Sequence, residues 1–365
     1  MAEHLISPEA LHRWVVGLFR AAGSSEREAT LTADHLVGAN LAGHDSHGVG
    51  MAPRYVRSLL EGELQLNRSV EIAHDAGSLV AVDGRHGMGQ SVTHQAMEIA
   101  IGRARRDGVC VMGLRNSHHL GRVGHWAEQA IAAGLASIHF TNVVAQAVVA
   151  PYGGAKPRLS TNPFTVGIPR EGADPIVLDF ATSAIAHGKA RVAYNKKVQV
   201  PPGNLIDAGG RPTQDPAVLF EPPEGPHGAL LTFAQHKGYA LSLVCDLLGG
   251  ALTGGGTAHP ANQPVRWGVW NNMLAIVFDP KRLGHGEAFE REARAFVAWV
   301  RSAPLSGDVD RIMVPGDPER RSRQARAQAL PIDAGTMSQL DEAAALVGER
   351  FGSSPGPCSA LARAG

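Results

Sequence analysis

Short apolar runs alternate with segments of helical periodicity between residues 78 and 141, and this pattern limits the possible folds more than any other feature of the sequence. Residues 78–82, 109–114 and 136–141 are predicted strands, and residues 90–106 and 123–133 are predicted helices. Strands that alternate with helices in this way indicate an α/β unit.

The regions on either side are organised differently. Ser7 and Pro8 form the predicted start of a helix that ends near residue 22, and a second helix follows to about residue 42. Residues 142–230 are rich in glycine, proline and short apolar runs, which favours a largely antiparallel sheet with long loops. Further helices are predicted over 53–60, 239–252, 287–301, 318–329 and 336–349, with a strand over 273–278. The glycine- and proline-rich tail is predicted to be disordered.

Composition and charge argue against several classes of protein. The chain is 44% apolar and 19% charged, which allows a substantial core. Its 34 basic and 34 acidic residues cancel, and no basic stretch is interleaved with aromatic residues, so we expect no nucleic acid partner. No apolar run is long enough to span a bilayer, no secretory signal is visible, and three scattered cysteines fit a reducing compartment. We therefore expect a cytoplasmic protein that binds neither a membrane nor a metal.

A glycine-rich turn at residues 84–89, GRHGMG, precedes a predicted helix and invites interpretation as a dinucleotide-binding fingerprint. Its spacing, GxxGxG, is the reverse of that fingerprint. The acidic residue that follows, Asp107, comes before the next strand instead of at its far end. We interpret the turn as an ordinary helix entry and expect no Rossmann fold.

Polar side chains crowd the segment 44–49, HDSHGV, between two predicted helices. An imidazole there can reach a ligand, and its titration near neutral pH suits a proton donor in carbonyl reduction. Arg54 lies far enough along the following helix to clamp a carboxylate by paired hydrogen bonds. A surface loop whose polar groups only cap the helices would explain the same residues.

Further segments place polar groups beside apolar runs. The segment 115–121, RNSHHLG, follows a predicted strand, where α/β proteins place ligands, although a double histidine is as often a structural pair. STNP at 160–163 and LDFATS at 178–183 could hold a phosphate or ribose, or could be ordinary turns. HKGY at 236–239 and VPGDP at 314–318 begin predicted helices; a lysine there suits a cofactor phosphate but is more commonly solvated.

Taken in order, HDSHGV, NSHHLG, STNPF, LDFATS, HKGYALSL and PGD resemble the motifs of the malate/L-lactate dehydrogenase-like family over about residues 5–350. The resemblance implies an α/β, non-Rossmann fold: a mixed, largely antiparallel seven-stranded sheet with flanking helices. It also implies a homodimer that binds NAD or NADP and a small-molecule substrate in a cleft near the dimer interface. The implied organisation is an N-terminal helical region with the catalytic histidine (1–76), an α/β segment (77–140), a cofactor-binding sheet domain (141–316), C-terminal helices packed back on the N-terminal region (317–352) and a disordered tail (353–365).

Positions carried over from the resemblance give the candidate site. His47 corresponds to the catalytic proton donor, Asp179 to an acid that assists it, and His119 to a second active-site histidine. The implied substrate contacts are Ser46, Met51, Arg54, Tyr55 and His118. The implied cofactor contacts are Thr161, Asn162, Leu178, Asp179, Phe180, Ala181, Thr182, Ser183, Ala184, His236, Lys237, Gly316, Asp317 and Pro318.

The sequence departs from the family pattern at three of these positions. Met51 stands where an arginine commonly follows SHGV, which weakens the carboxylate clamp or moves it to Arg54 and favours an apolar or enlarged substrate. His118 replaces the usual asparagine, and Asp317 stands where glutamate is common.

The predicted function is therefore an NAD(P)-dependent dehydrogenase or reductase of a small 2-oxo/2-hydroxy acid or a cyclic imino acid, with His47 as proton donor. Two alternatives remain open. One is a non-catalytic or substrate-shifted homologue, which Met51 would explain. The other is a metal-dependent hydrolase built on the clustered histidines, although no metal-binding motif accompanies them.

Overall fold

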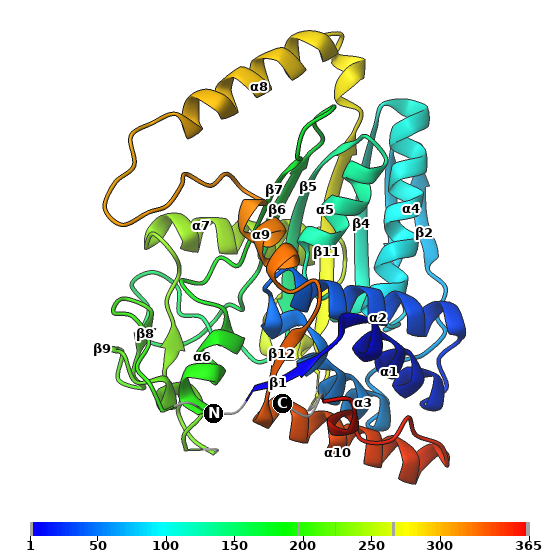
Figure 1. Cartoon of the computed structure of the whole chain (residues 1–365), viewed down its shortest axis with the longest axis vertical. Coiled ribbons are helices and arrows are strands. Elements are labelled where there is room, and N and C mark those ends of the chain that lie inside the picture. Colours follow the sequence, from blue (N-terminus) through cyan, green and yellow to red (C-terminus); the bar gives the residue numbers. More distant parts are fainter. Residues whose placement is uncertain (1–2, 196, 223, 265–266, 363–365) are drawn as a thin grey trace.

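A seven-stranded sheet forms the centre of the molecule in the computed structural model, which describes residues 3–195, 197–222, 224–264 and 267–362 (Figure 1). The strand order is β2-β3-β4-β11-β5-β6-β7. Only β3 and β4 pair in parallel, and the other neighbours are antiparallel. The strands are β2 (Glu71–Ala76), β3 (Leu79–Asp83), β4 (Val109–His118), β5 (Ala136–Val144), β6 (Phe164–Ile168), β7 (Ile176–Phe180) and β11 (Trp270–Phe278). The expected mixed, largely antiparallel α/β fold is confirmed.

Two helices cover the sheet, α4 (Gly89–Asp107) and α5 (Gly124–Ala132). The long helix α4 connects the parallel pair β3 and β4, as a parallel connection requires. Its apolar side, which includes Met97, packs with Trp126 of α5 and with Met112 and Leu114 of β4 in one buried cluster. Each fully buried side chain of this size contributes about 1.5–3 kcal/mol.

The two ends of the described chain form a second layer. Helices α1 (Pro8–Ala21), α2 (Glu26–Leu41), α3 (Ala52–Leu60) and α10 (Ala334–Phe351) share one apolar core. The expected cap of α1 is present, since the hydroxyl of Ser7 accepts from Ala10 N, and the hydroxyl of Ser25 caps α2 by accepting from Glu28 N. Strand β1 (Glu3–Ile6) pairs antiparallel with β12 (Leu330–Asp333) and holds the two ends together.

The tail beyond α10 is ordered as far as residue 362, which corrects the prediction of disorder for residues 353–362. Trp14 Nε1 donates to the carbonyl of Gly356 at 2.9 Å, and a 3-10 helix, Cys358–Leu361, buries Cys358 in the N-terminal core. Glycine and proline there serve turns between anchor points, which composition alone does not distinguish from disorder. Residues 363–365 lie outside the described chain.

A smaller unit fills part of the loop-rich region. It contains α6 (His187–Asn195), a 3-10 helix (Pro216–Leu219) and a three-stranded sheet of β8 (Leu205–Ile206), β9 (Pro212–Thr213) and β10 (Ala229–Leu230). Helix α7 (His236–Cys245) follows and continues as a π-helical turn, Asp246–Ala251.

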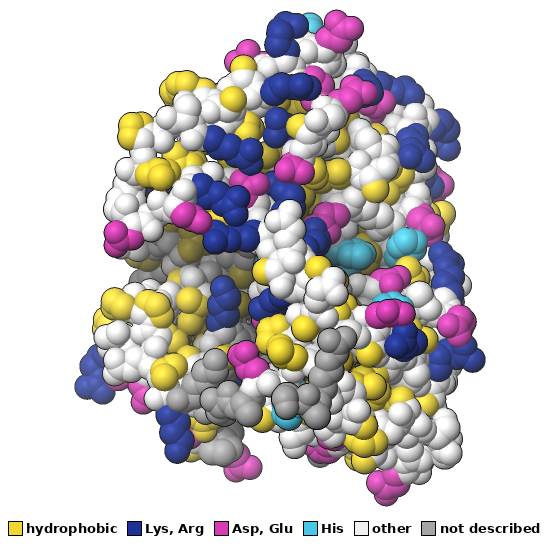
Figure 2. Space-filling view, viewed as in Figure 1, with side chains coloured by type: hydrophobic (Ala, Val, Ile, Leu, Met, Phe, Trp, Pro, Cys, Tyr) yellow, Lys and Arg dark blue, Asp and Glu magenta, His cyan; other side chains and the backbone are white. Residues whose placement is uncertain are grey.

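Helix α8 (Gly286–Arg301) projects from the body, and the chain returns from it to α9 (Asp317–Ala325) (Figure 1). None of its residues is buried, and Phe296 and Trp299 are 57% and 70% exposed. Figure 2 shows hydrophobic side chains around α8 and the returning loop. Among the described helices, none has the length and apolar character needed to cross a membrane.

Candidate active site

A cleft of about 1520 Å³ lies where the N-terminal layer, the central sheet and the α6 unit meet. Its walls come from the 44–47 turn, the loop after β4, the end of β7, helix α6 and the start of α9. His47, His119 and Asp179 all line it. Residues far apart in the sequence are thus brought to one cavity.

The turn that carries His47 is held by a side chain of the preceding helix. Asn40 of α2 accepts from Val49 N at 2.8 Å and donates to the Asp45 carboxylate at 2.7 Å. Gly48 is required because a Cβ there would lie 2.2 Å from Asn40 Oδ1. The imidazole of His47 therefore projects from a fixed turn, with its Nδ1 3.0 Å from Ser46 Oγ.

His119 lies opposite His47 in the cleft. The two rings stack with their centroids 5.6 Å apart. Asparagines of β11 position the loop that carries His119: Asn271 accepts from Leu120 N and Asn272 from Asn116 N, each at 2.8 Å. The ring's Nδ1 is bonded to Tyr55 Oη at 2.7 Å.

Asp179, on β7, lines the same cleft as His47 and His119. Its carboxylate accepts from Gly124 N at 2.8 Å and from the hydroxyl of Thr165 at 2.9 Å. A Cβ at position 124 would lie 2.7 Å from the same carboxylate, so glycine allows the close approach. The carboxylate is fixed without a salt bridge to a cation among the residues described, and its charge acts on His47.

Burial dominates the electrostatics of the two histidines. Burial, together with the charges of His44 and Arg122, lowers the pKa of His47 to about 4, and the charge of Asp179 opposes them. Burial also lowers the pKa of His119 well below its usual value, with His47 acting in the same direction. Both imidazoles are therefore neutral near pH 7 in the absence of a ligand.

The predicted substrate residues divide into two groups. Ser46, Met51 and Arg54 line the cleft, and Arg54 Nε donates to the carbonyl of Trp267 at 2.9 Å. Tyr55 and His118 are fully buried and do not line it. The ring of His118 is instead bonded to Ser58 Oγ at 2.9 Å, so it supports the site from behind.

The predicted cofactor residues divide in the same way. Those that line the cleft are Thr161, Asp179, Phe180, Ala181, Ser183, Ala184 and Pro318. Asn162 and Thr182 are buried and brace the backbone, since Asn162 accepts from Val143 N and Thr182 donates to the carbonyl of Thr161. Leu178, His236, Lys237, Gly316 and Asp317 are outside the cleft lining, and Asp317 is paired with Arg301 and Arg320.

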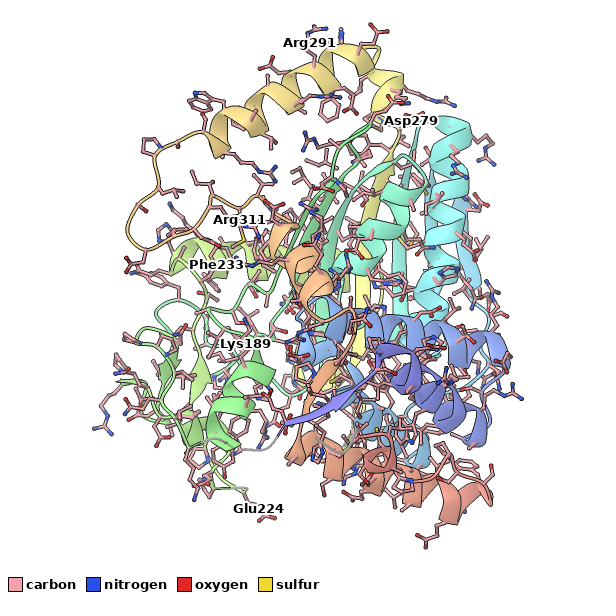
Figure 3. All side chains as sticks on the ribbon, viewed as in Figure 1. Lys189, Glu224, Phe233, Asp279, Arg291 and Arg311 are labelled. Atoms are coloured by element: carbon pink, nitrogen blue, oxygen red, sulfur yellow. The ribbon has the colours of Figure 1, made fainter. Side chains whose placement is uncertain are left out.

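Helix α6 contributes residues that sequence analysis did not find. His187, Lys189 and Arg191 all line the cleft, and Lys189 is labelled in Figure 3. The start of α6 is so close to the turn that carries His47 that a Cβ at Gly188 would lie 2.5 Å from Ser46 Cβ. Nine helical residues between loops give only a weak periodic signal, so this wall of the cleft was not predictable.

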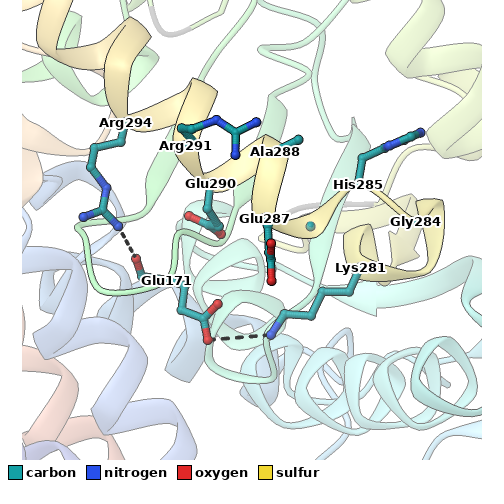
Figure 4. A pocket seen from close by; sticks show the side chains of 10 residues that line it. Glu171, Lys281, Gly284, His285, Glu287, Ala288, Glu290, Arg291 and Arg294 are labelled. Carbon is teal, nitrogen blue, oxygen red and sulfur yellow. Dashed lines mark hydrogen bonds and ion pairs between the residues drawn. The ribbon is translucent and has the colours of Figure 1, made fainter.

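A second hollow lies under α8, where Lys281 and Arg294 contact Glu171 (Figure 4). Its lining is largely exposed charged residues, and no side chain of the catalytic cleft reaches it. Within the described part of the chain, no group of three or more acidic, histidine or cysteine side chains could hold a metal ion.

Comparisons of the sequence and the structure with known proteins all point to one family. The family model of malate/L-lactate dehydrogenase matches residues 6–341. Hydroxycarboxylate dehydrogenase B of Escherichia coli K12 is 46% identical over 347 residues, which cover 94% of this chain and 95% of that protein. Two solved structures are each 30% identical: sulfolactate dehydrogenase from Methanocaldococcus jannaschii (TM-score 0.82; 96% of this chain, 98% of the other) and Δ1-piperideine-2-carboxylate reductase from Pseudomonas syringae (TM-score 0.78; 93% and 99%).

Proposed function

From the chain's membership of the malate/L-lactate dehydrogenase family, which makes it an oxidoreductase, we propose that it transfers hydride between NAD or NADP and C2 of a small 2-oxo/2-hydroxy acid. A cyclic imino acid is the second candidate substrate, because a relative of the same fold is named for that reaction. The observation that carries the proposal is the pairing of His47 and His119 beside Asp179 in one cleft.

The cleft suits a dinucleotide as well as a substrate. Its volume of about 1520 Å³ exceeds the ~300–1,000 Å³ of ordinary small-ligand pockets. Lys156, Arg158 and Lys189 line it and supply cations for a diphosphate, while Thr161 and Ser183 supply hydroxyl groups. A bound nicotinamide would supply or accept the hydride.

The chain's own residues manage the proton and the developing negative charge. His47 gives a proton to the substrate oxygen during reduction and takes it back during oxidation. Asp179 favours the protonated form of His47, because its charge raises the pKa of that ring against the effect of burial. His119 adds a hydrogen bond to the same oxygen, a contribution that can reach about 2.7–4 kcal/mol.

The substrate carboxylate would be held by cations other than an arginine at position 51. Arg54 and Arg191 both line the cleft, and the charges of both add to burial in lowering the pKa of His187. Met51 offers an apolar surface at the same wall, which favours a 2-oxo acid with an apolar side chain over a dicarboxylate.

A thermal-shift titration with NADH and NADPH, followed by a turnover screen of 2-oxo acids and cyclic imines, tests the proposal. One nucleotide should raise the melting temperature and support turnover of an oxo acid. Stabilisation without turnover across the panel would favour a non-catalytic homologue. If neither nucleotide stabilises the protein at millimolar concentration, the proposal is wrong.

We also propose a homodimer formed through α8 and α7. Phe289, Phe296 and Trp299 of α8 are exposed, as are Leu243 and Val244 of α7. Two exposed apolar helices on one chain can cover each other in a symmetric pair. Light scattering should give twice the chain mass, and Trp299→Glu should give monomers; a wild-type monomer would contradict the dimer.

A further inference from the structure

A chain of hydrogen bonds ends on the buried side of the His119 ring. Tyr55 Oη lies 2.7 Å from His119 Nδ1, and Gln90 Nε2 lies 3.1 Å from Tyr55 Oη. The same Gln90 nitrogen lies 3.2 Å from the main-chain carbonyl oxygen of His119. Tyr55 is 0% and Gln90 1% exposed, so solvent does not compete for these contacts.

The carbonyl of His119 sets the direction of the protons in this chain. A carbonyl oxygen only accepts, so the Gln90 atom beside it must be the amide nitrogen; a flipped amide would set two oxygens 3.2 Å apart. The same NH₂ group then donates to Tyr55 Oη. The Tyr55 hydroxyl must therefore donate its own proton to its other neighbour among the described residues, His119 Nδ1. A nitrogen that accepts this proton carries none of its own, so Nδ1 is unprotonated.

We propose that Tyr55 and Gln90 hold His119 as the tautomer protonated on Nε2, a neutral hydrogen-bond donor to the substrate oxygen, while His47 alone carries the transferred proton. The proposal rests on the proposed function and deepens it by dividing the work between the two histidines. Tyr55 and Gln90 act through His119 and are positioning residues.

The local packing supports this division. Gly89 lets α4 begin against the His119 backbone, because a Cβ there would lie 2.0 Å from the His119 carbonyl oxygen, and Gln90 follows directly. Groups facing His119 from three elements, namely His47, His118 and Arg54, all lower its pKa along with burial. If Nδ1 carried a proton, the Tyr55 hydroxyl would have to point its own proton elsewhere, and it would not lose that proton because burial raises the pKa of Tyr55.

His47 has a partner of a different kind. Its Nδ1 faces the hydroxyl of Ser46 at 3.0 Å, and a serine hydroxyl can rotate to donate or to accept. The ring of His47 can therefore gain and lose a proton without leaving a buried group unpaired. The two histidines differ in this respect although their rings stack.

Replacement of His119 by residues that cannot titrate separates the two roles. Glutamine offers a neutral N–H near the position of Nε2, whereas alanine offers none. His119→Gln should keep kcat within about tenfold of wild type with an unchanged pH profile, and His119→Ala should lose about 10²–10³-fold. Equal loss in both variants, or loss of a limb of the pH profile in His119→Gln, would overturn the proposal.

Tyr55→Phe and Gln90→Met form a matched pair for the positioning role. The first removes the proton given to Nδ1, and the second leaves it in place. We expect kcat to fall at least tenfold in Tyr55→Phe and clearly less in Gln90→Met, with melting temperatures recorded for both. Equal losses in the two variants would contradict the proposed relay.

Nitrogen NMR of protein carrying ¹⁵N-histidine reads the tautomer without turnover. The His119 ring, assigned by its absence in His119→Gln, should be protonated on Nε2 at neutral pH and become a mixture in Tyr55→Phe. A charged ring or one protonated on Nδ1 in the wild type would refute the inference. If no oxo acid is turned over, the proposed function fails, while this measurement still decides the tautomer.

Discussion

The pH dependence of the reaction follows from the burial of His47. Reduction needs the protonated ring, and with a pKa of about 4 the protonated fraction falls tenfold for each further pH unit. Between pH 6 and 8 we expect kcat/KM for the oxo acid to fall about hundredfold. The slope is the same for any pKa below about 5, and kcat/KM reports the pKa of the free enzyme.

The assay is the initial rate of cofactor oxidation with the oxo acid, paired with the reverse reaction on the hydroxy acid. Oxidation needs neutral His47, so its kcat/KM should be flat over the same range. His47→Gln is the control and should remove the slope together with most of the activity. A reductive profile that is level below pH 6 and bends near the ordinary histidine value of about 6.5 would refute the reasoning.

Three further outcomes are expected. Asp179→Asn removes the charge that raises the pKa of His47, so kcat/KM for reduction should fall at every pH above 6 while its slope against pH stays the same. Met51→Arg should raise kcat/KM for a dicarboxylic relative to a monocarboxylic oxo acid by about tenfold or more, measured in competition, since a hydrogen bond to a charged group contributes about 1.5–3 kcal/mol. Burial lowers the pKa of His139 to about 3 in the folded protein. As the pH falls below about 6.5, this histidine becomes protonated in the unfolded chain but not in the folded one, so the folded protein loses stability. From pH 7 to 5 urea unfolding should show a loss about 2 kcal/mol greater in wild type than in His139→Gln, and equal losses would contradict the assignment.

Periodicity was enough to predict the elements with strong patterns. The helices that begin at Ser7 and Ser25 have capping residues followed by apolar spacing, and both are confirmed. Strand β4 was predicted to end at Leu114 but continues to His118, because its last residues are polar yet still pair with β11. Side-chain amides of Asn271 and Asn272 support that extension, and no local pattern shows this.

The residues proposed to be catalytic could be predicted only as motifs, without their partners. The roles of His47, His119 and Asp179 were carried over from the family resemblance, and the structure brings all three side chains to one cleft. Gln90 lies in the first turn of α4 and had no predicted role, and Tyr55 of α3 was predicted as a substrate contact instead of a partner of His119. Their role depends on three elements that meet only in the folded chain.

The most direct test of the central claim is the transfer of deuterium from a reduced nicotinamide carrying it at C4. Wild-type protein with an accepted 2-oxo acid should give a hydroxy acid labelled at C2, detected by mass spectrometry, and His47→Ala should give almost none while cofactor still raises its melting temperature. A nucleotide that stabilises the wild type but leaves every oxo acid and imine unlabelled would contradict the proposed hydride transfer.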